Sequence, residues 1–439
     1  MATGTTTAPQ AGGFWSRFTV NRRVLIGVFF FVLGLLVFFG ASASDADTTT
    51  TLTLEAGAVE DVPHVTVPTQ GFLLFTAFTM VIGGSVAVVL AGAEAPRSLK
   101  RWALLFLAFN GVLIIPAVLI AAAAGDRTNV TTMFSESLRL ATPIALGAMA
   151  GLWCERSGVV NIAIEGMMLF GACFGFATLF FIQRDYPEMA DNLALLLSVG
   201  VAVLSGGIVA LLHAWLSITF KTDQIVSGTV INILALGVTS FVRSEFLLSS
   251  EAGTITLPTV AIPLLADLPI VGQALFNNKP IFYSMFVVIL LTHLILFNTS
   301  WGLRMRAVGE HPSAADTLGI NVNRTRWINV FIGGLIAGLG GAWFTLEVTG
   351  RFTDNMTSGR GFIALAALIF GKWTPLGSLG AAVLFGFSDA LGVRLQALNV
   401  NIPVQFLQMV PYIVTIVVLA GLIGRALPPK AVGKPYEKE

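Results

Sequence analysis

The sequence predicts an all-α fold, a polytopic transmembrane helical bundle with about 10–12 membrane segments and broken or short helices near its centre. The first observation is composition, because only 11% of the 439 residues are charged and 55% are hydrophobic. Soluble domains carry about a quarter charged residues. The second observation is that apolar runs of about 20 residues, the length of a membrane helix, recur along the whole chain. The net charge of +1 excludes a strong overall field for nucleic acid or other acidic partners.

Ten apolar runs are long enough to be membrane spans. In chain order we expect spans near Val24–Ala41, Phe72–Gly92, Trp102–Ala124, Phe134–Trp153, Val159–Ile182, Leu193–Leu216, Gln224–Leu248, Ile281–Phe297, Trp327–Val348 and Phe406–Gly424. Between the last two lie two shorter apolar pieces, Phe362–Phe370 and Leu379–Val393, each too short or too glycine-rich to span comfortably. We expect tilted spans or half-helices there, because broken backbone at membrane depth must be covered by protein or water.

The positions of Lys and Arg predict the orientation, because cytoplasmic segments of membrane proteins carry an excess of both. If the N-terminus is cytoplasmic and every piece crosses, cytoplasmic segments hold 17 of the 25 Lys and Arg residues and outer segments hold six. The first outer loop, Ser42–Gln70, has five acidic residues and no Lys or Arg. We therefore expect both termini in the cytoplasm.

The first apolar run has a second interpretation. Arg22 and Arg23, the apolar run and then Ala41-Ser42-Ala43 resemble a secretory signal peptide with its cleavage site. The apolar region of such peptides has about 7–15 residues, and this run is longer. Its length favours an uncleaved membrane anchor.

The stretch Cys154–Met168 contains a carboxylate that lipid solubility does not explain. Glu165 lies several residues into an expected span, where an ionised group is costly unless it faces protein or water. One interpretation is a carboxylate that lines or gates a pathway. The other is a structural carboxylate bonded to a neighbouring helix, with Asn161 one turn away. The cost of burial alone does not name a role, so both interpretations stay open.

The loop Trp301–Val322 predicts a short helix on the cytoplasmic side. Pro312 suits the first turn of a helix and Gly319 suits the residue after its end, so we expect a helix over Pro312–Leu318. Ala314 and Ala315 are small and would let a partner approach closely. The pattern favours a docking element over a solvated connector, which needs no capped helix.

The stretch Met356–Gly377 holds an apolar half-span between glycine-rich turns. Broken helices of this kind often form transport sites, because their free backbone ends point into the pathway. Tight helix packing through small residues is the alternative. The stretch weakly echoes Gly158–Ala172, a faint sign of an internal repeat.

Motifs of enzymes and metal proteins are missing from the sequence. Gly371-Lys372 is followed by Trp373, so no phosphate-binding loop of the Gly-x-x-x-x-Gly-Lys-Ser/Thr type occurs. The four histidines are scattered, and the two cysteines, Cys154 and Cys173, lack the spacing of a metal site. We therefore expect no catalytic residue, no metal site, no cofactor and no enzymatic activity.

Several motifs, in a fixed order along the chain, resemble a known family. They are Arg139–Ile144, Glu155–Ile162 with Glu165–Met167, Asp223–Gly228, Gly309–Val322 and Gly359–Ala366. At these motifs the chain resembles the permease subunits of bacterial ABC importers of the ribose, branched-chain amino acid and nucleoside group, and most of all the nucleoside and simple-sugar branch. Ala163 stands where the family often has Gly, and His311 where it often has a polar residue such as Asn.

The resemblance implies a division of the chain. Residues 1–132 would be an N-terminal extension with about three transmembrane spans and the acidic outer loop. Residues 133–427 would be the ABC importer permease core, and residues 428–439 a cytoplasmic tail.

The resemblance also implies partners and candidate site residues. A second homologous permease subunit would complete the pathway in the cell membrane, a cytoplasmic ATP-binding subunit would drive it, and an extracytoplasmic substrate-binding protein or lipoprotein would deliver the cargo. The helix Pro312–Leu318 corresponds to the coupling helix, with candidate coupling residues Glu310, Pro312, Ala314, Ala315, Asp316 and Gly319. The candidate pathway or gate residues are Asn161, Glu165, Gln224 and Ser227.

We expect the cargo to be nucleosides, with purine nucleosides favoured. Simple sugars or branched-chain amino acids are the alternative within the same class. A stand-alone secondary carrier is a further alternative, although intramembrane charge is sparse.

Overall fold

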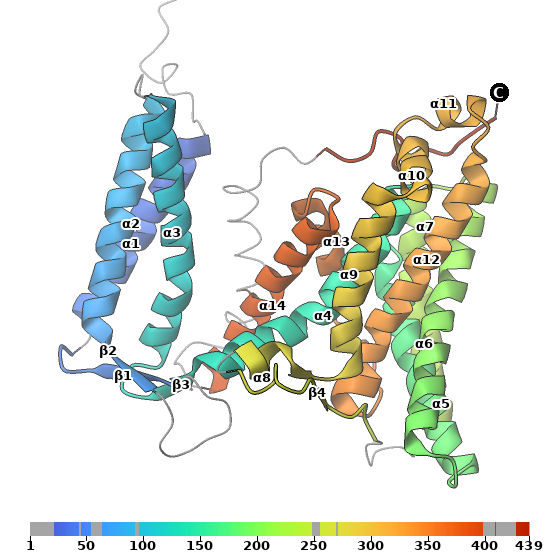
Figure 1. Ribbon diagram of the computed structural model, residues 1–439, viewed down its shortest axis with the longest axis horizontal. Coiled ribbons are helices and arrows are strands. Elements are labelled where there is room, and N and C mark those ends of the chain that lie inside the picture. Colours follow the sequence, from blue (N-terminus) through green and yellow to red (C-terminus); the bar gives the residue numbers. More distant parts are fainter. Residues whose placement is uncertain are drawn as a thin grey trace, which may run out of the picture. The chain divides into compact units, whose positions relative to one another are not determined.

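The computed structural model describes residues 22–43, 45–53, 64–92, 96–247, 255–268, 271–397, 409 and 427–438. In chain order its elements are α1 (Arg22–Ser42), β1 (Thr49–Thr53), β2 (His64–Pro68), α2 (Thr69–Gly92), α3 (Arg97–Ala122), β3 (Arg127–Asn129), α4 (Val130–Glu155), α5 (Ile164–Asp185), α6 (Asp191–Ala214), η2 (Trp215–Thr219), α7 (Gln224–Val242), η3 (Arg243–Leu247), β4 (Val260–Ala261), α8 (Val271–Leu275), β5 (Asn277–Asn278), α9 (Pro280–Asn298), α10 (Ser300–Glu310), α11 (Pro312–Thr317), α12 (Val322–Ala342), η5 (Trp343–Thr349), α13 (Arg360–Phe370) and α14 (Pro375–Ala397). Helices dominate (Figure 1), and ten helices of the described residues are long and apolar enough to cross a membrane. The expected all-α polytopic bundle is confirmed.

The two short apolar pieces have different structures. Phe362–Phe370 lies in α13, an 11-residue half-helix as expected. Leu379–Val393 lies in α14, which runs for 23 residues from Pro375, so the expectation that this piece is too short to span was wrong. Its glycines are positions of close packing, since a Cβ added at Gly386 would lie 2.3 Å from the carbonyl oxygen of Ser137 on α4. The expected span Phe406–Gly424 falls outside the described residues, except Met409.

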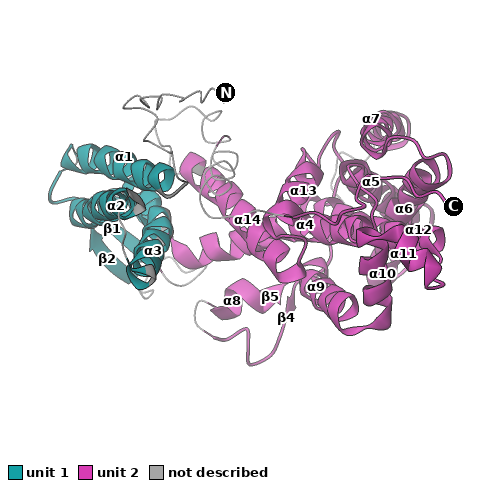
Figure 2. Cartoon of the chain, turned by 90° about the horizontal axis from the view of Figure 1, so that it is seen from above, with its two compact units in different colours: residues 1–52, 64–128, 416–422 teal, residues 53–63, 129–415, 423–439 magenta. Residues whose placement is uncertain are grey.

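The chain divides into two compact units (Figure 2). In the described part of the first unit, α1, α2 and α3 pack together, and a small sheet of order β2-β1-β3 lies at one end of the helices. Buried Thr50 of β1 joins the sheet to the helices. Its hydroxyl lies 2.9 Å from that of Thr69 on α2 and donates to the carbonyl oxygen of Ile120 on α3 at 3.1 Å.

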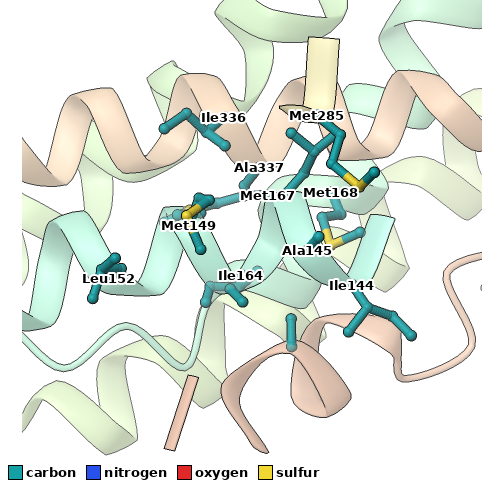
Figure 3. Packing of buried hydrophobic residues seen from close by; sticks show 14 of the residues in the cluster. Ile144, Ala145, Met149, Leu152, Ile164, Met167, Met168, Met285, Ile336 and Ala337 are labelled. Atoms are coloured by element: carbon teal, nitrogen blue, oxygen red, sulfur yellow. The ribbon is translucent and has the colours of Figure 1, made fainter. Parts of the chain in front are cut away.

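The core of the second unit surrounds α4, which is buried at every position from Ala141 to Glu155. Methionine side chains from three helices meet there (Figure 3), with Met149 on α4, Met167 and Met168 on α5 and Met285 on α9. Flexible thioether side chains fill the irregular space between helices that cross at different angles.

The helices of the second unit repeat one packing pattern. α4 packs against α13 and α14, and α12 packs against α5 and α6. α4 thus packs against the two long or half-length helices that follow α12 in the chain, and α12 packs against the two helices that follow α4. This arrangement agrees with the weak sequence echo between Gly158–Ala172 and the region of α13. It brings the first turns of α5 and α13 together.

Candidate functional site

A non-helical segment separates α4 from α5, and we call residues 156–163 the α4–α5 connection. The expected span Val159–Ile182 was wrong at its start, because α5 begins only at Ile164. Glu165 therefore lies in the first turn of a helix and not several residues inside one. The apolar run from Val159 suggested helix, but side chains of distant helices bind its backbone groups and hold it in another conformation.

Two of these side chains bind Val160. Gln224 of α7 accepts a hydrogen bond from the Val160 amide at 2.7 Å, and His213 of α6 donates from Nε2 to the Val160 carbonyl at 2.9 Å. The hydroxyl of Ser227 lies 3.2 Å from the other ring nitrogen of His213. Gln224 and Ser227, both predicted as pathway or gate residues, thus lie together at the connection. Because unpaired backbone groups are costly to bury, these contacts fix its conformation.

Asn232 of α7 holds the end of the same connection. Its Nδ2 donates to the carbonyl of Ile162 at 3.0 Å, and its Oδ1 accepts from the amide of Gly166 at 2.8 Å. Asn161, also a predicted site residue, does not join this network. Its Nδ2 faces the sulfur of Cys154 at 3.3 Å, and its buried Oδ1 has no hydrogen-bond partner among the described residues.

Glu165 joins the two interrupted helices. Its Oε1 accepts from the hydroxyl of Thr357 at 2.6 Å and from the amide of Gly359 at 2.8 Å, and its Oε2 accepts from the amide of Gly361 at 2.6 Å. The carboxylate, only 6% exposed, lies at the N-terminal ends of both α5 and α13, where helix dipoles favour negative charge. Of the two interpretations of Glu165, these contacts favour the carboxylate bonded to a neighbouring helix.

The chain approaches α13 through residues 350–359, which we call the η5–α13 connection. It contains four residues with left-handed backbone, Gly350, Asn355, Ser358 and Gly359. Gly361 has no room for a side chain, since an added Cβ would lie 2.6 Å from the Cα atom of Glu165. The first turns of two half-buried helices therefore meet at close range, an arrangement found at the sites of many transporters.

The other end of α13 is fastened to the end of α4. Glu155 accepts a hydrogen bond from the indole nitrogen of Trp373 at 2.5 Å, and Arg156 donates to the Trp373 carbonyl through Nε at 3.0 Å. Lys372 and Trp373 both have positive φ angles of 52°, so these contacts hold a strained turn between α13 and α14. Burial lowers the pKa of the Arg156 guanidinium, and nearby Glu310 partly offsets that effect.

The helix predicted in the loop Trp301–Val322 is present as α11. Pro312 is its first residue, as expected, and the helix ends at Thr317, one residue before the expected end. Gly319 follows Leu318 with a φ of +81°. The two alanines point in different directions, because Ala314 is exposed while Ala315 is buried against Val308 and Val322. Ala315 is therefore part of the packing beneath the helix and not of its outer face.

The remaining predicted residues of this region contact the C-terminal segment. Glu310 accepts a hydrogen bond from the amide of Lys430 at 3.4 Å, and Asp316 lies 3.6 Å from the ammonium of Lys438. Leu318, the residue after α11, is 81% exposed, so an apolar side chain projects from the end of the helix. Within the described part of the chain, no group of three His, Cys, Asp or Glu residues could hold a metal ion.

Five residues with contacts at the connections were not predicted from the sequence: His213, Asn232, Arg326, which donates to the carbonyl of Ser157, Thr357 and Trp373. A signal existed for the first three, because polar side chains inside apolar helices are costly unless another group binds them. Thr357 and Trp373 gave no such signal, since both are ordinary residues of turns at the ends of spans.

Comparisons with known proteins show the family of the chain. The family model described as "Branched-chain amino acid transport system / permease component" matches residues 133–419. The chain is 44% identical to the guanosine ABC transporter permease protein NupQ of Bacillus subtilis (strain 168) over 311 residues, which are 69% of this chain and 95% of that protein.

Two further relatives have similar coverage. The nucleoside ABC transporter permease protein NupC of Lactococcus lactis is 38% identical over 68% of this chain and 94% of its own length. The putative glucose ABC transporter permease protein TsgC13 of Haloferax volcanii is 33% identical over 70% of this chain and 98% of its own length. No solved structure matches the chain. The chain belongs to the family of ABC transporter permease components, and it is a multi-pass transport subunit of the cell membrane and not an enzyme.

Proposed function

We propose that this chain is the permease subunit of an ATP-driven ABC importer that carries nucleosides, with purine nucleosides as its cargo. The similarity to a guanosine permease over 95% of that protein's length is the observation that carries this proposal. The nucleoside permease of Lactococcus lactis supports the same cargo. The glucose permease is 33% identical, which makes a simple sugar the second candidate.

The junction of α5 and α13 is the proposed gate. The two connections interrupt the bundle where helix N-termini meet, and non-helical backbone at such depth is stable only beside protein or a water-filled path. Glu165 ties the η5–α13 connection to α5, and Gln224 ties the α4–α5 connection to α7. Movement of either connection would therefore move the other through the carboxylate of Glu165.

The proposed coupling route starts at α11. A separate ATP-binding subunit would contact its exposed face, including Ala314 and Leu318. α10 carries the movement inward, because Gly309 is packed so closely that an added Cβ would lie 2.2 Å from the carbonyl oxygen of Arg156. Arg156 begins the α4–α5 connection and also binds Trp373 at the end of α13.

The remaining parts of the proposal concern the assembly. The pathway is completed by a second, homologous permease subunit, and an extracytoplasmic binding protein delivers the cargo. Two more distant relatives support a second type of permease, the nucleoside permease NupB of Lactococcus lactis at 23% identity and the guanosine permease NupP of Bacillus subtilis at 26%.

The proposed topology has both termini and α11 in the cytoplasm. The excess of Lys and Arg in those segments supports it. The contact between Lys438 and Asp316 is consistent with it, because it joins the C-terminal segment to α11. Residues 1–132 form the proposed N-terminal extension, 133–427 the permease core and 428–439 the tail.

Uptake of radiolabelled guanosine into cells that express the complete importer tests the cargo. Unlabelled purine nucleosides should compete with guanosine uptake, whereas glucose and leucine at the same concentration should not. Competition by glucose alone would reassign the cargo to simple sugars. The variant Ala314→Trp, which enlarges the exposed face of α11, should insert normally and lose uptake, and normal uptake by it would refute the coupling role.

A further inference from the structure

The C-terminal residues 427–438, which we call the C-terminal strap, lie across α10 and α11 (Figure 1). The strap has no helix or strand of its own, yet Pro429 and Ala431 are buried. A solvated tail would not bury apolar residues in this way. The strap is therefore a docked part of the second unit.

Its first half fastens to α10. The amide of Ala431 donates to the carbonyl of Gly309 at 2.9 Å, which satisfies one of the free carbonyls at the end of that helix. The same glycine is the point where α10 lies against Arg156. The strap therefore binds the helix at the place where it contacts the α4–α5 connection.

Its second half fastens to α11. Tyr436 packs on the apolar cluster of Val308, Ala315 and Val322, which joins α10, α11 and α12. Lys438 lies 3.6 Å from Asp316, and Glu437 forms an ion pair with Lys221 at 2.7 Å in the turn before α7. The strap thus connects α11 both to the helices beneath it and to the turn that precedes Gln224.

Arg326 of α12 lies between the strap and the α4–α5 connection. Its Nη1 donates to the carbonyl of Lys434 at 3.0 Å, and its Nε donates to the carbonyl of Ser157 at 3.2 Å. The residue is only 1% exposed, and its Nη2 has no hydrogen-bond partner among the described residues. Gly158 makes room for it, because an added Cβ would lie 2.8 Å from that nitrogen.

This geometry makes the strap part of the environment of a buried cation. Two backbone carbonyls, one from the strap and one from the connection, accept hydrogen bonds from the guanidinium. If the strap detaches, Arg326 loses one of these acceptors, and a buried charged donor without a partner is costly. The position of the strap and the position of the α4–α5 connection are therefore linked through one side chain.

We propose that the C-terminal strap and Arg326 are positioning elements for coupling, which hold α10 and α11 against the α4–α5 connection so that movement of α11 reaches the gate. This proposal rests on the proposed importer function. It assigns the strap and Arg326 a role in transmission and none in binding cargo or nucleotide. Without the strap, the ATP-binding subunit moves α11 but the connection no longer follows.

The test measures ATP hydrolysed per nucleoside transported by the complete importer in liposomes. The variants are a chain that ends at Pro428, Arg326→Met, and Tyr436→Ala, which loosens the strap without altering Arg326. Arg324→Met is the matched control, because Arg324 is exposed on the same helix. We expect the ratio to rise roughly tenfold in the first two variants, since one hydrogen bond to a charged group changes a population by about that factor. Tyr436→Ala should give a smaller rise, and the control should give none.

Two outcomes would overturn the proposal. Normal uptake with a normal ratio in the truncated chain would show that the strap is dispensable. A proportional fall of hydrolysis and uptake would show a purely structural role, since a positioning defect changes their ratio. If truncation prevents insertion, Tyr436→Ala and Arg326→Met still decide the question. Failure of the proposed importer function is distinguishable, because it would appear as guanosine uptake by the wild-type chain alone without ATP, whatever the strap variants do.

Discussion

Replacing Glu165 tests whether one carboxylate holds the two interrupted helices together. Its three donors lie at 2.6–2.8 Å, and each hydrogen bond to a charged group contributes about 1.5–3 kcal/mol. In Glu165→Gln one oxygen still accepts, but the new amide meets the Gly361 amide as a second donor, so about 2 kcal/mol is lost. In Glu165→Ala three donors lose their acceptor, at roughly 1–3 kcal/mol each, so the loss is about 5 kcal/mol.

Thermal and denaturant unfolding of the purified chain in detergent, with uptake measured in parallel, checks these values. We expect both stability and uptake to fall from wild type to the Gln variant and further to the Ala variant, because the N-terminal turn of α13 loosens in the same order. Glu188→Gln is the matched control, since Glu188 is exposed in the loop after α5 and should leave both unchanged. An Ala variant with wild-type stability and uptake would refute the assignment of Glu165 as the tie between α5 and α13.

The remaining predictions concern the contacts of Trp373 and of the C-terminal strap, and the packing under α11. Trp373→Phe removes the indole donor to Glu155, so the buried carboxylate loses a hydrogen-bond partner. The free energy of unfolding from denaturant titrations should fall by about 1–3 kcal/mol. An unchanged midpoint would contradict this. The hydrogen bond from Lys221 holds the pKa of Glu437 below its ordinary range. The ion pair therefore protects the C-terminal strap from proteolysis fully above the ordinary carboxyl pKa, and this protection should weaken as the pH falls through the lowered pKa of Glu437. Lys221→Ala should weaken that pH dependence, because the contact of Asp316 with Lys438 is still present, and a strap with the same pH profile in both chains would count against the ion pair. Ala315→Trp should destabilise the chain because Ala315 is buried, and equal stability of Ala315→Trp and wild type would show that its site is not packed.

The parts of the fold that local rules decide were predictable from the sequence. Apolar runs located the spans, and Pro312 and Gly319 marked the ends of α11 because both residues have strong local backbone preferences. The half-helix α13 followed from a short apolar run between glycines. These features depend on residues close to one another in the chain.

The features that depend on distant contacts were not predictable. The apolar sequence of Val159–Ala163 predicts the start of a span. The segment is not helical because Gln224 and Asn232, which are distant in the chain, form hydrogen bonds with its backbone. The sequence of Leu379–Val393 predicts a piece too short or too glycine-rich to span, because the packing of Gly386 against α4 cannot be inferred from one sequence. The strap looked like a tail because its anchors, such as Arg326, lie about a hundred residues away.

The central claim is that this chain forms half of a nucleoside pathway whose gate moves only when a separate ATP-binding subunit acts on α11. The most direct measurement is guanosine accumulation in liposomes, with ATP on the side of the ATP-binding subunit, for the complete importer and for this chain alone. The account predicts accumulation only with the complete importer and ATP, and none with Ala314→Trp in that complex. Guanosine uptake by the chain alone without ATP would contradict it and would establish a stand-alone carrier.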